Sequence, residues 1–306
     1  MAQPDCGPRE ANVHVAWRLA QAERAAQAYA SNEKLAALTV AGSVGTGLAD
    51  RFSDLELDCY WLAPPSDLDR LGTIRELGGG SETIWDYWPE GGEWSDDYQL
   101  GDLHVSISSL LVATIEQFLD DVIVRIDTDP VKHIRLAAVQ RCLPLNGAEL
   151  VRAWRSRAAL YPDRLVQAVV EQSLDSEVLR GWAARDALVA RGDELAVHAL
   201  LTRIGHAVLG AVLALNHLYL PNPMFKWQKH LIGELDVVPE QFEERLQFLA
   251  TSGSPDALRE AETLMADTVQ IVKTRTDADI ASFCEGLLDR RHAIDPPSTD
   301  KRTASP

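Results

Sequence analysis

The sequence predicts an α+β fold in which a small mixed sheet is followed by an all-helical bundle. Apolar runs with the two-residue period of strands are confined to the first third of the chain, whereas the sequence after Thr114 has the apolar spacing of helices almost throughout. A chain of 306 residues, 46% of them hydrophobic, can form one large or two medium-sized cores. We therefore expect a sheet domain over residues 1–113, a helical domain over 114–292 and a disordered polar tail over 293–306.

The expected sheet domain begins with a helix and two strands. Residues 12–30 have alanine, leucine and aromatic spacing suited to a helix that packs on a sheet. The apolar run LAALTVA over 35–41 predicts a buried strand, and alternating polar and apolar residues over 54–62 predict a second. Ser66 then offers an N-cap to a helix that ends at the glycine run 78–80.

An aromatic segment over 82–100 predicts a β-hairpin, because a Pro-Glu-Gly-Gly turn lies in its middle. Its aromatic residues include Trp85, Tyr87, Trp88 and Trp94. Such rings could stack on a nucleobase or a sugar, but pairing between neighbouring strands is the more common explanation. A further strand over 101–111 completes the expected sheet.

The stretch AGSVGTGLADRFSDLELDCYW contains the strongest functional pattern in the chain. The first strand ends at Gly42, where a residue without Cβ allows a sharp turn and the close approach of a phosphate. Ser43 and Thr46 add hydroxyl groups, while Gly45 and Gly47 keep the turn open. Successive backbone N–H groups in such a turn can form a nest for an anion. The pattern predicts a phosphate cradle.

Two carboxylates follow the glycine turn on the alternating strand. Asp54 and Glu56 are two residues apart, so they share one face of the strand, with about 6.5–7 Å between their Cα atoms. This spacing lets both carboxylates converge on Mg²⁺ ions that also bind triphosphate oxygens. We expect Asp54 and Glu56 to be metal ligands.

The glycine turn and the acidic pair together resemble the signature of the nucleotidyltransferase superfamily, which has the DNA polymerase beta type of catalytic domain. Within it, GSVGTGLADRFSDLEL is most similar to bacterial antibiotic nucleotidyltransferases such as the aminoglycoside adenylyltransferases. The helical half is similar to the extension of a poorly characterised bacterial nucleotidyltransferase group. The resemblance implies two Mg²⁺ ions, ATP or another nucleoside triphosphate as substrate, and transfer of the nucleoside monophosphate to a hydroxyl of a small acceptor.

In the nucleotidyltransferase family that this chain resembles, a third Asp or Glu on a later strand acts as a metal ligand or as the general base. The register most like the family places His104 at this position, and Asp102 lies one pleat earlier on the same face. Asp102 could reach the site or be a solvated turn residue. His104 could act as the base, since its ordinary pKa lies near neutrality, or be structural. If neither contributes, the protein would be a nucleotide-binding or regulatory module without transferase activity.

Charge and composition limit the partners. The formal net charge of −17 argues against a nucleic-acid partner, because nucleic-acid binding depends on Lys and Arg. An acidic surface would attract a cationic small acceptor such as an aminoglycoside, or simply serve solubility. A nucleotidyltransferase of the toxin–antitoxin type, which modifies a protein or RNA, is a third interpretation that the large helical domain makes less attractive.

Other features indicate a cytoplasmic protein. The four cysteines have no metal-type spacing, and the first residues lack a basic region followed by an apolar segment. The apolar stretch over 204–220 contains two His and one Asn, which favours a buried helix over a membrane span. Lys226, beside an expected helix start, could contact the triphosphate or be a surface charge. Related enzymes often form dimers, so the resemblance leaves a homodimer open.

Overall fold

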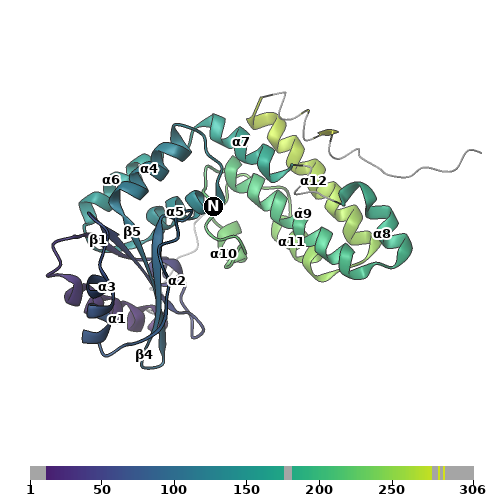
Figure 1. Ribbon diagram of the computed structural model, residues 1–306. Coiled ribbons are helices and arrows are strands. Elements are labelled where there is room, and N and C mark those ends of the chain that lie inside the picture. The colour runs from purple at the N-terminus through teal and green to yellow at the C-terminus, as the bar shows by residue number, and fades with distance from the viewer. Residues whose placement is uncertain (1–11, 176–180, 278–281, 283–284, 287–306) are drawn as a thin grey trace, which may run out of the picture. The chain divides into compact units, whose positions relative to one another are not determined.

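The computed structural model describes residues 12–175, 181–277, 282 and 285–286 (Figure 1). The chain forms two compact units. Unit 1 comprises Met1–Leu165 and Leu218–Met224, and unit 2 comprises Val166–His217 and Phe225–Pro306. The described strands all lie in unit 1, and the described part of unit 2 is helical, so the α+β class that the sequence predicts is confirmed.

Unit 1 is built on a six-stranded mixed sheet with the order β3-β4-β5-β2-β1-β6. Strands β2 and β5 pair in parallel, and every other neighbouring pair is antiparallel. The hairpin expected over 82–100 is present as β3 and β4. The strands are β1 (Leu35–Val40), β2 (Leu55–Trp61), β3 (Gly80–Ile84), β4 (Glu93–Leu100), β5 (Leu103–Leu111) and β6 (Leu143–Asn146).

Three helices of unit 1, α1, α3 and α5, begin at side-chain caps that the local sequence provides. Asn12 caps α1 by accepting hydrogen bonds from two backbone N–H groups, and Ser66 forms a capping box with Asp69 at the start of α3. Asp129 caps α5, which has a proline in its first turn. The helices are α1 (Val13–Tyr29), α2 (Gly42–Gly45), α3 (Asp67–Glu76), α4 (Val112–Ile123), α5 (Pro130–Arg141) and α6 (Ala148–Ala158); α7 (Asp163–Ser173) spans the boundary between the units.

The two faces of the sheet differ in chemistry. One face, which we call the core face, contributes side chains such as Leu55, Leu57 and Val105 to an apolar cluster with α1 and α3. The opposite face, which we call the site face, carries the alternate residues of the same strands, among them Glu56 and Asp58. Helices α4 and α6 also contact the sheet, at β5 and β1 respectively (Figure 1).

Unit 1 extends well beyond the boundary expected at residue 113. Strand β6 pairs with β1 at the edge of the sheet, and α6 packs beside both. The four residues of β6 are too few to show a strand period, so the sequence indicated only a break between helices. The helical bundle accordingly starts near Val166 rather than at 114, and the tail expected over 293–306 lies outside the described residues.

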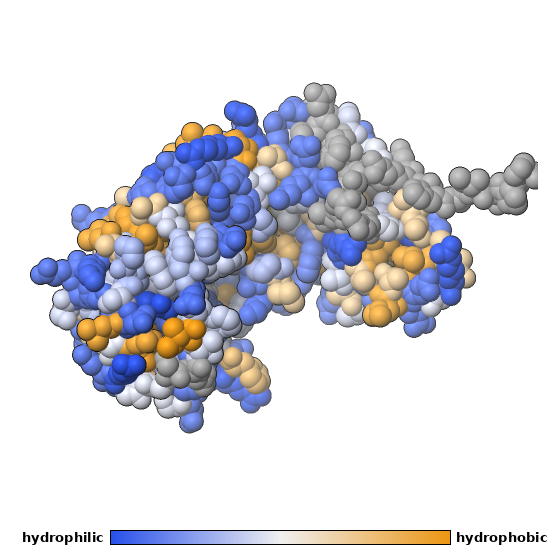
Figure 2. Space-filling model, in the orientation of Figure 1, coloured by the Kyte–Doolittle hydropathy of each residue, from blue (hydrophilic) through white to orange (hydrophobic). Residues whose placement is uncertain are grey.

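In the described residues of unit 2, the core is formed around α9. This helix is long and apolar enough to span a membrane by length and composition alone, but twelve of its residues are buried, and it contacts α8, α11 and α12. The stretch over 204–215 is therefore a buried helix, as expected. The elements are η1 (Trp182–Ala184), α8 (Arg185–Arg191), α9 (Glu194–Leu215), α10 (Gln228–Ile232), α11 (Phe242–Thr251) and α12 (Pro255–Arg275). Hydrophilic residues cover most of the face shown in Figure 2, with separate apolar patches between them.

Candidate functional site

The glycine turn follows β1 directly and forms the one-turn helix α2. Gly42 has a φ of +56°, and a Cβ there would overlap the carboxylate of Glu56, whose Oε1 would be only 2.8 Å away. A Cβ on Gly45 would overlap the carbonyl oxygen of Val40. Gly45 is therefore required by a backbone contact, Gly42 is favoured by its positive φ, and the Glu56 carboxylate lies directly against the turn.

The hydrogen bonds inside the turn leave fewer N–H groups able to bind a phosphate than the sequence predicts. The N–H groups of Gly45, Thr46 and Gly47 donate to carbonyl oxygens of the same turn. The Thr46 hydroxyl also donates to the backbone, with 3.0 Å between its Oγ1 and the carbonyl oxygen of Gly42. These groups are engaged, which argues against the anion contacts expected from Thr46 and from the later glycines. The first N–H groups of a helix have no acceptor within it, so Gly42 and Ser43 are the better donors for a phosphate.

The acidic pair lies where β2 begins. Asp54 immediately precedes the strand, and Leu55, between the two acids, is buried in the core, so an extended chain places Asp54 and Glu56 on the site face. The backbone before Asp54 is held from α1: Arg18 Nε donates to the carbonyl oxygen of Ser53 at 2.9 Å. The role of the pair as metal ligands stays a prediction.

A third carboxylate reaches the same region from β4. The parallel pairing of β2 and β5 places Glu56 beside Ser106, and the antiparallel pairing of β4 and β5 places Ser106 beside Asp97. Ser106 Oγ donates to Asp97 Oδ1 at 2.5 Å. Glu56, Ser106 and Asp97 thus form a row across three neighbouring strands. Two strand spacings separate the Cα atoms of Glu56 and Asp97 by about 10 Å.

Asp102 and His104, the two candidates for the third catalytic group, lie in different surroundings. Asp102 is exposed in the two-residue turn between β4 and β5, four residues before Ser106, which is about 13 Å along the strand. His104 is half-buried, with its Nε2 3.8 Å from Asp97 Oδ1 and 3.5 Å from Ser106 Oγ. The pairing therefore places Asp97, with His104 close to it, nearer to Glu56 along the strands than Asp102.

Sequence reasoning considered only Asp102 and His104 as the third catalytic group, and not Asp97. The signal was present in part, because Glu93, Ser95, Asp97 and Gln99 alternate along the second strand of the hairpin. The short turn at Gly101 then pairs Leu100 with Leu103, which sets Asp97 opposite Ser106. The parallel pairing of Ser106 with Glu56 has no such local signal.

A buried ionic cluster lies one pleat further along the site face. Arg135 of α5 forms an ion pair with Glu93, and its Nη1 is 3.7 Å from Asp58 Oδ1. The same guanidinium is 3.5 Å from Ser108 Oγ, and the Tyr60 hydroxyl lies 3.4 Å from Asp58 Oδ2. We call Arg135, Asp58 and Glu93 the Arg135 cluster. It joins α5 to β2 and β4 beside the acidic row.

Burial raises the pKa of Asp58 to about 6, although the charge of Arg135 acts in the opposite direction. Between about pH 4 and 6, folded Asp58 retains a proton that the unfolded chain has released, so this group destabilises the fold as pH rises. We expect the free energy of unfolding of wild type, relative to Asp58→Asn, to fall by roughly 1–3 kcal/mol from pH 4 to 7. Urea unfolding at several pH values measures this, and a difference that does not change with pH would contradict it.

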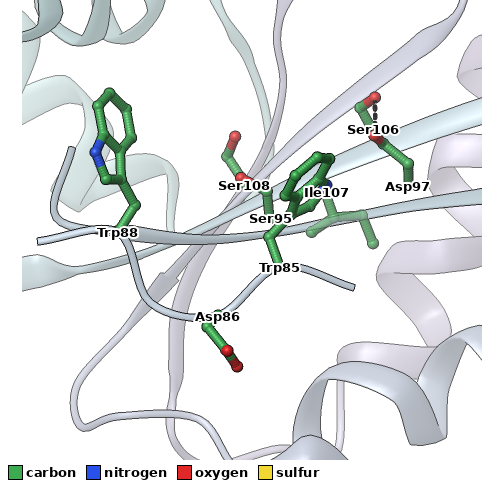
Figure 3. Close-up of a pocket in the computed structure, with 8 residues that line it drawn as sticks. All are labelled: Trp85, Asp86, Trp88, Ser95, Asp97, Ser106, Ile107 and Ser108. Atoms are coloured by element: carbon green, nitrogen blue, oxygen red, sulfur yellow. Dashed lines mark hydrogen bonds between the residues drawn. The ribbon is translucent and has the colours of Figure 1, made fainter. Parts of the chain in front are cut away.

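A pocket of about 560 Å³ opens on the site face beside the acidic row. Figure 3 shows the rings of Trp85 and Trp88 on the same side of the strands as Ser106 and Ser108, whereas Asp86 points away. Trp85 is 53% exposed and Trp88 is 45% exposed. The pocket, which we call the Trp pocket, is lined by Trp85, Asp86, Trp88, Ser95, Asp97, Ser106, Ile107 and Ser108.

The aromatic segment therefore has two parts. The rings of Tyr87, in the connection between β3 and β4, and Trp94, on β4, are in contact in a tilted arrangement, with centroids 4.5 Å apart. Trp85 and Trp88 instead line the pocket. The ring of Trp88 lies against Gly91, so close that a Cβ at that glycine would overlap it.

Two further expectations concern a bound metal ion and Lys226. In the described part of the chain, no three His, Cys, Asp or Glu side chains form a group that could hold a metal ion by themselves. A cation held by Asp54 and Glu56 would need further oxygen ligands, as Mg²⁺ commonly takes from water and phosphate. Lys226 is exposed in the turn before α10, in unit 2, and its expected contact with phosphate stays a prediction.

Comparison with known proteins gives limited information. No protein-family model and no curated protein matches the sequence. Among solved structures, the chain is similar to a nucleotidyltransferase-like protein from Exiguobacterium sibiricum, with 14% identity, a TM-score of 0.33, and coverage of 83% of this chain and 78% of that one. A TM-score of this size does not establish a shared fold, so the assignment of a function depends on the residues of the site face.

Proposed function

We propose that the protein is a Mg²⁺-dependent nucleotidyltransferase that moves a nucleoside monophosphate, most simply AMP from ATP, to a hydroxyl of a small acceptor. The observation that carries this proposal is the contact between the glycine turn and the acidic strand. The Glu56 carboxylate occupies the space where any side chain at Gly42 would lie. A group bound to the N–H groups at the start of the turn would therefore lie beside a carboxylate, which is the arrangement that a metal-bridged phosphate needs.

The acidic side chains suit Mg²⁺ because carboxylate oxygens are its preferred protein ligands. Asp54 and Glu56 would hold the metal, with two ions expected from the resemblance. When bound, Mg²⁺ would neutralise charge on the triphosphate oxygens and on the oxygens of the displacement. Gly42 and Ser43 would bind the terminal phosphates through their backbone N–H groups. This leaves the protein to position the reactants and to remove one proton.

In the proposed reaction, the acceptor oxygen forms a bond to the α-phosphorus and the bond from that phosphorus to the bridging oxygen of pyrophosphate breaks. The hydroxyl proton passes to Asp97, and pyrophosphate leaves with the electron pair. His104, close to Asp97, is the alternative proton acceptor. Ser106 holds Asp97 in place through its hydroxyl.

A small cationic acceptor, such as an aminoglycoside antibiotic, agrees with the net charge of −17 and with the acidic rather than basic lining of the Trp pocket. A nucleic-acid acceptor would need clustered cations. The proposed enzyme is cytoplasmic, has no membrane partner and forms a homodimer, as the sequence and the resemblance suggest.

A catalytically impaired nucleotide-binding module is the second candidate. The observation that favours it is that Ser106, not an acid, lies directly beside Glu56, so that the third carboxylate comes from one strand further away. The direct test is to incubate the protein with labelled nucleoside triphosphates, Mg²⁺ and a panel of hydroxylated acceptors. Acceptor-dependent release of pyrophosphate supports the transferase, whereas tight nucleotide binding without release supports the module.

The third acid can be identified with two matched variants. Asp97→Asn retains the hydrogen bond from Ser106 but loses the proton acceptor, so we expect the transfer rate to fall about a hundredfold or more. Asp102→Asn changes an exposed turn residue, and its rate should stay near wild type. The measurement is pyrophosphate release at saturating nucleotide. A large loss in Asp102→Asn with wild-type activity in Asp97→Asn would instead make Asp102 the third acid.

A further inference from the structure

The Trp pocket combines two exposed indole rings, three serine hydroxyls and a carboxylate held by one of those serines. We infer that this pocket is the acceptor subsite and that Trp85, Trp88 and Asp97 select a ring-bearing organic cation with a hydroxyl group. The inference rests on the proposed function, because it assigns the attacking hydroxyl to this side of the acidic pair.

The position of the pocket in the sheet supports an acceptor rather than the triphosphate. The order of the strands places β5 and β4 on one side of β2, and β1 with its glycine turn on the other. Transfer by in-line displacement has the attacking and leaving oxygens on opposite sides of the phosphorus. With pyrophosphate at the glycine turn and metal at β2, the attacking hydroxyl must approach from the side of β5 and β4. Ser106 and Asp97, on those strands, line the pocket there.

The lining determines the charge of the ligand. The side chains that line the pocket include no Lys or Arg. Arg135, which is 3.5 Å from Ser108 Oγ, already pairs with Glu93 and Asp58, so the lining favours a cation over a phosphate or a carboxylate. Asp97 carries negative charge into the pocket, and Trp rings attract cations through their faces more strongly than Tyr or Phe rings. An ammonium group would be attracted both by the Asp97 carboxylate and by the faces of the Trp rings. The exposed ring faces of Trp85 and Trp88 would stack on a sugar or aromatic ring in the same ligand.

Three probes of the same ring and similar size separate charge from stacking. Tyramine is a phenol with an ammonium group, tyrosol is its neutral alcohol, and 4-hydroxyphenylacetate is the corresponding anion. We expect the full-length protein, without nucleotide, to bind tyramine about tenfold more tightly than tyrosol, and the anion most weakly. Ligand-observed NMR and calorimetry measure the three affinities.

Variants place the binding in the pocket. Trp85→Ala and Trp88→Ala should each weaken tyramine binding about fivefold or more, while Trp88→Phe should retain most of it. Trp17→Ala is the matched control, since Trp17 is 48% exposed on α1 and does not line the pocket. Two separate variants are needed because Trp88 also packs on Gly91, so Trp88→Ala could loosen the hairpin turn.

Several outcomes would overturn the inference. These are no tyramine binding, equal affinity for the three probes, or wild-type affinity in both Trp→Ala variants. Weaker binding of MgATP in those variants would also overturn it, because the pocket would then hold the nucleobase. Failure of the proposed function would be visible separately, as the absence of pyrophosphate release from wild type with every acceptor, whatever the three probes do.

Discussion

Asp54→Asn is expected to lower nucleotide transfer by roughly a hundredfold or more and to leave the fold intact. The carboxylate lies just before β2 and is half-exposed, so its loss should cost little stability. In the proposed site it is one of two protein ligands for Mg²⁺, and a metal ion contributes several kcal/mol of transition-state stabilisation. The asparagine keeps the size of the side chain and removes its charge. The measurement is pyrophosphate release, together with MgATP affinity by calorimetry.

The control for Asp54→Asn is a carboxylate that belongs to unit 2. Asp256 lies in the first turn of α12, in unit 2, and its exposed ion pair with Arg259 has no part in the proposed site. Asp256→Asn should behave as wild type in both measurements. Full turnover in Asp54→Asn would reject the metal assignment, and thermal unfolding far below that of wild type would assign Asp54 a structural role instead.

Arg135→Met is expected to destabilise the fold by about 3–5 kcal/mol at neutral pH. The variant leaves Asp58 and Glu93 buried without their cation, and an unpaired buried charge costs far more than an exposed one. The loss should shrink as pH falls toward 5, because Asp58, whose pKa burial raises to about 6, can then take up a proton. Urea unfolding at pH 5 and pH 7.5 measures both effects.

Arg157→Met is the matched control for the Arg135 cluster. Arg157 also pairs with two carboxylates, Glu116 and Asp120, but its side chain is 37% exposed. Solvent weakens such pairs, so the expected loss is about 1 kcal/mol or less. Adding Asp58→Asn and Glu93→Gln to Arg135→Met should recover much of the stability, since no unpaired charge remains. Similar losses in Arg135→Met and Arg157→Met would show that burial does not determine the strength of this cluster.

Much of the fold follows from short-range rules. Asn12, Ser66 and Asp129 begin helices as N-caps, and the burial of alternate residues in β2 follows from its period. The hairpin of β3 and β4 follows from its turn and aromatic residues. The boundary between the units is harder to predict from sequence, because β6 is an edge strand of only four residues and is identified by its pairing with β1.

The sequence by itself determined the glycine turn and the alternating acidic strand, because each depends on a few neighbouring residues. Gly42 is favoured by its positive φ and Gly45 by its contact with the Val40 carbonyl, and Asp54 and Glu56 flank a buried leucine. Only the tertiary structure placed Asp97 in one row with Ser106 and Glu56. Asp97 is about 40 residues from Glu56 in the chain, and the two are brought together through Ser106 by a parallel pairing of β2 and β5. No turn connects these strands directly, so their register depends on packing of the whole sheet rather than on any local pattern.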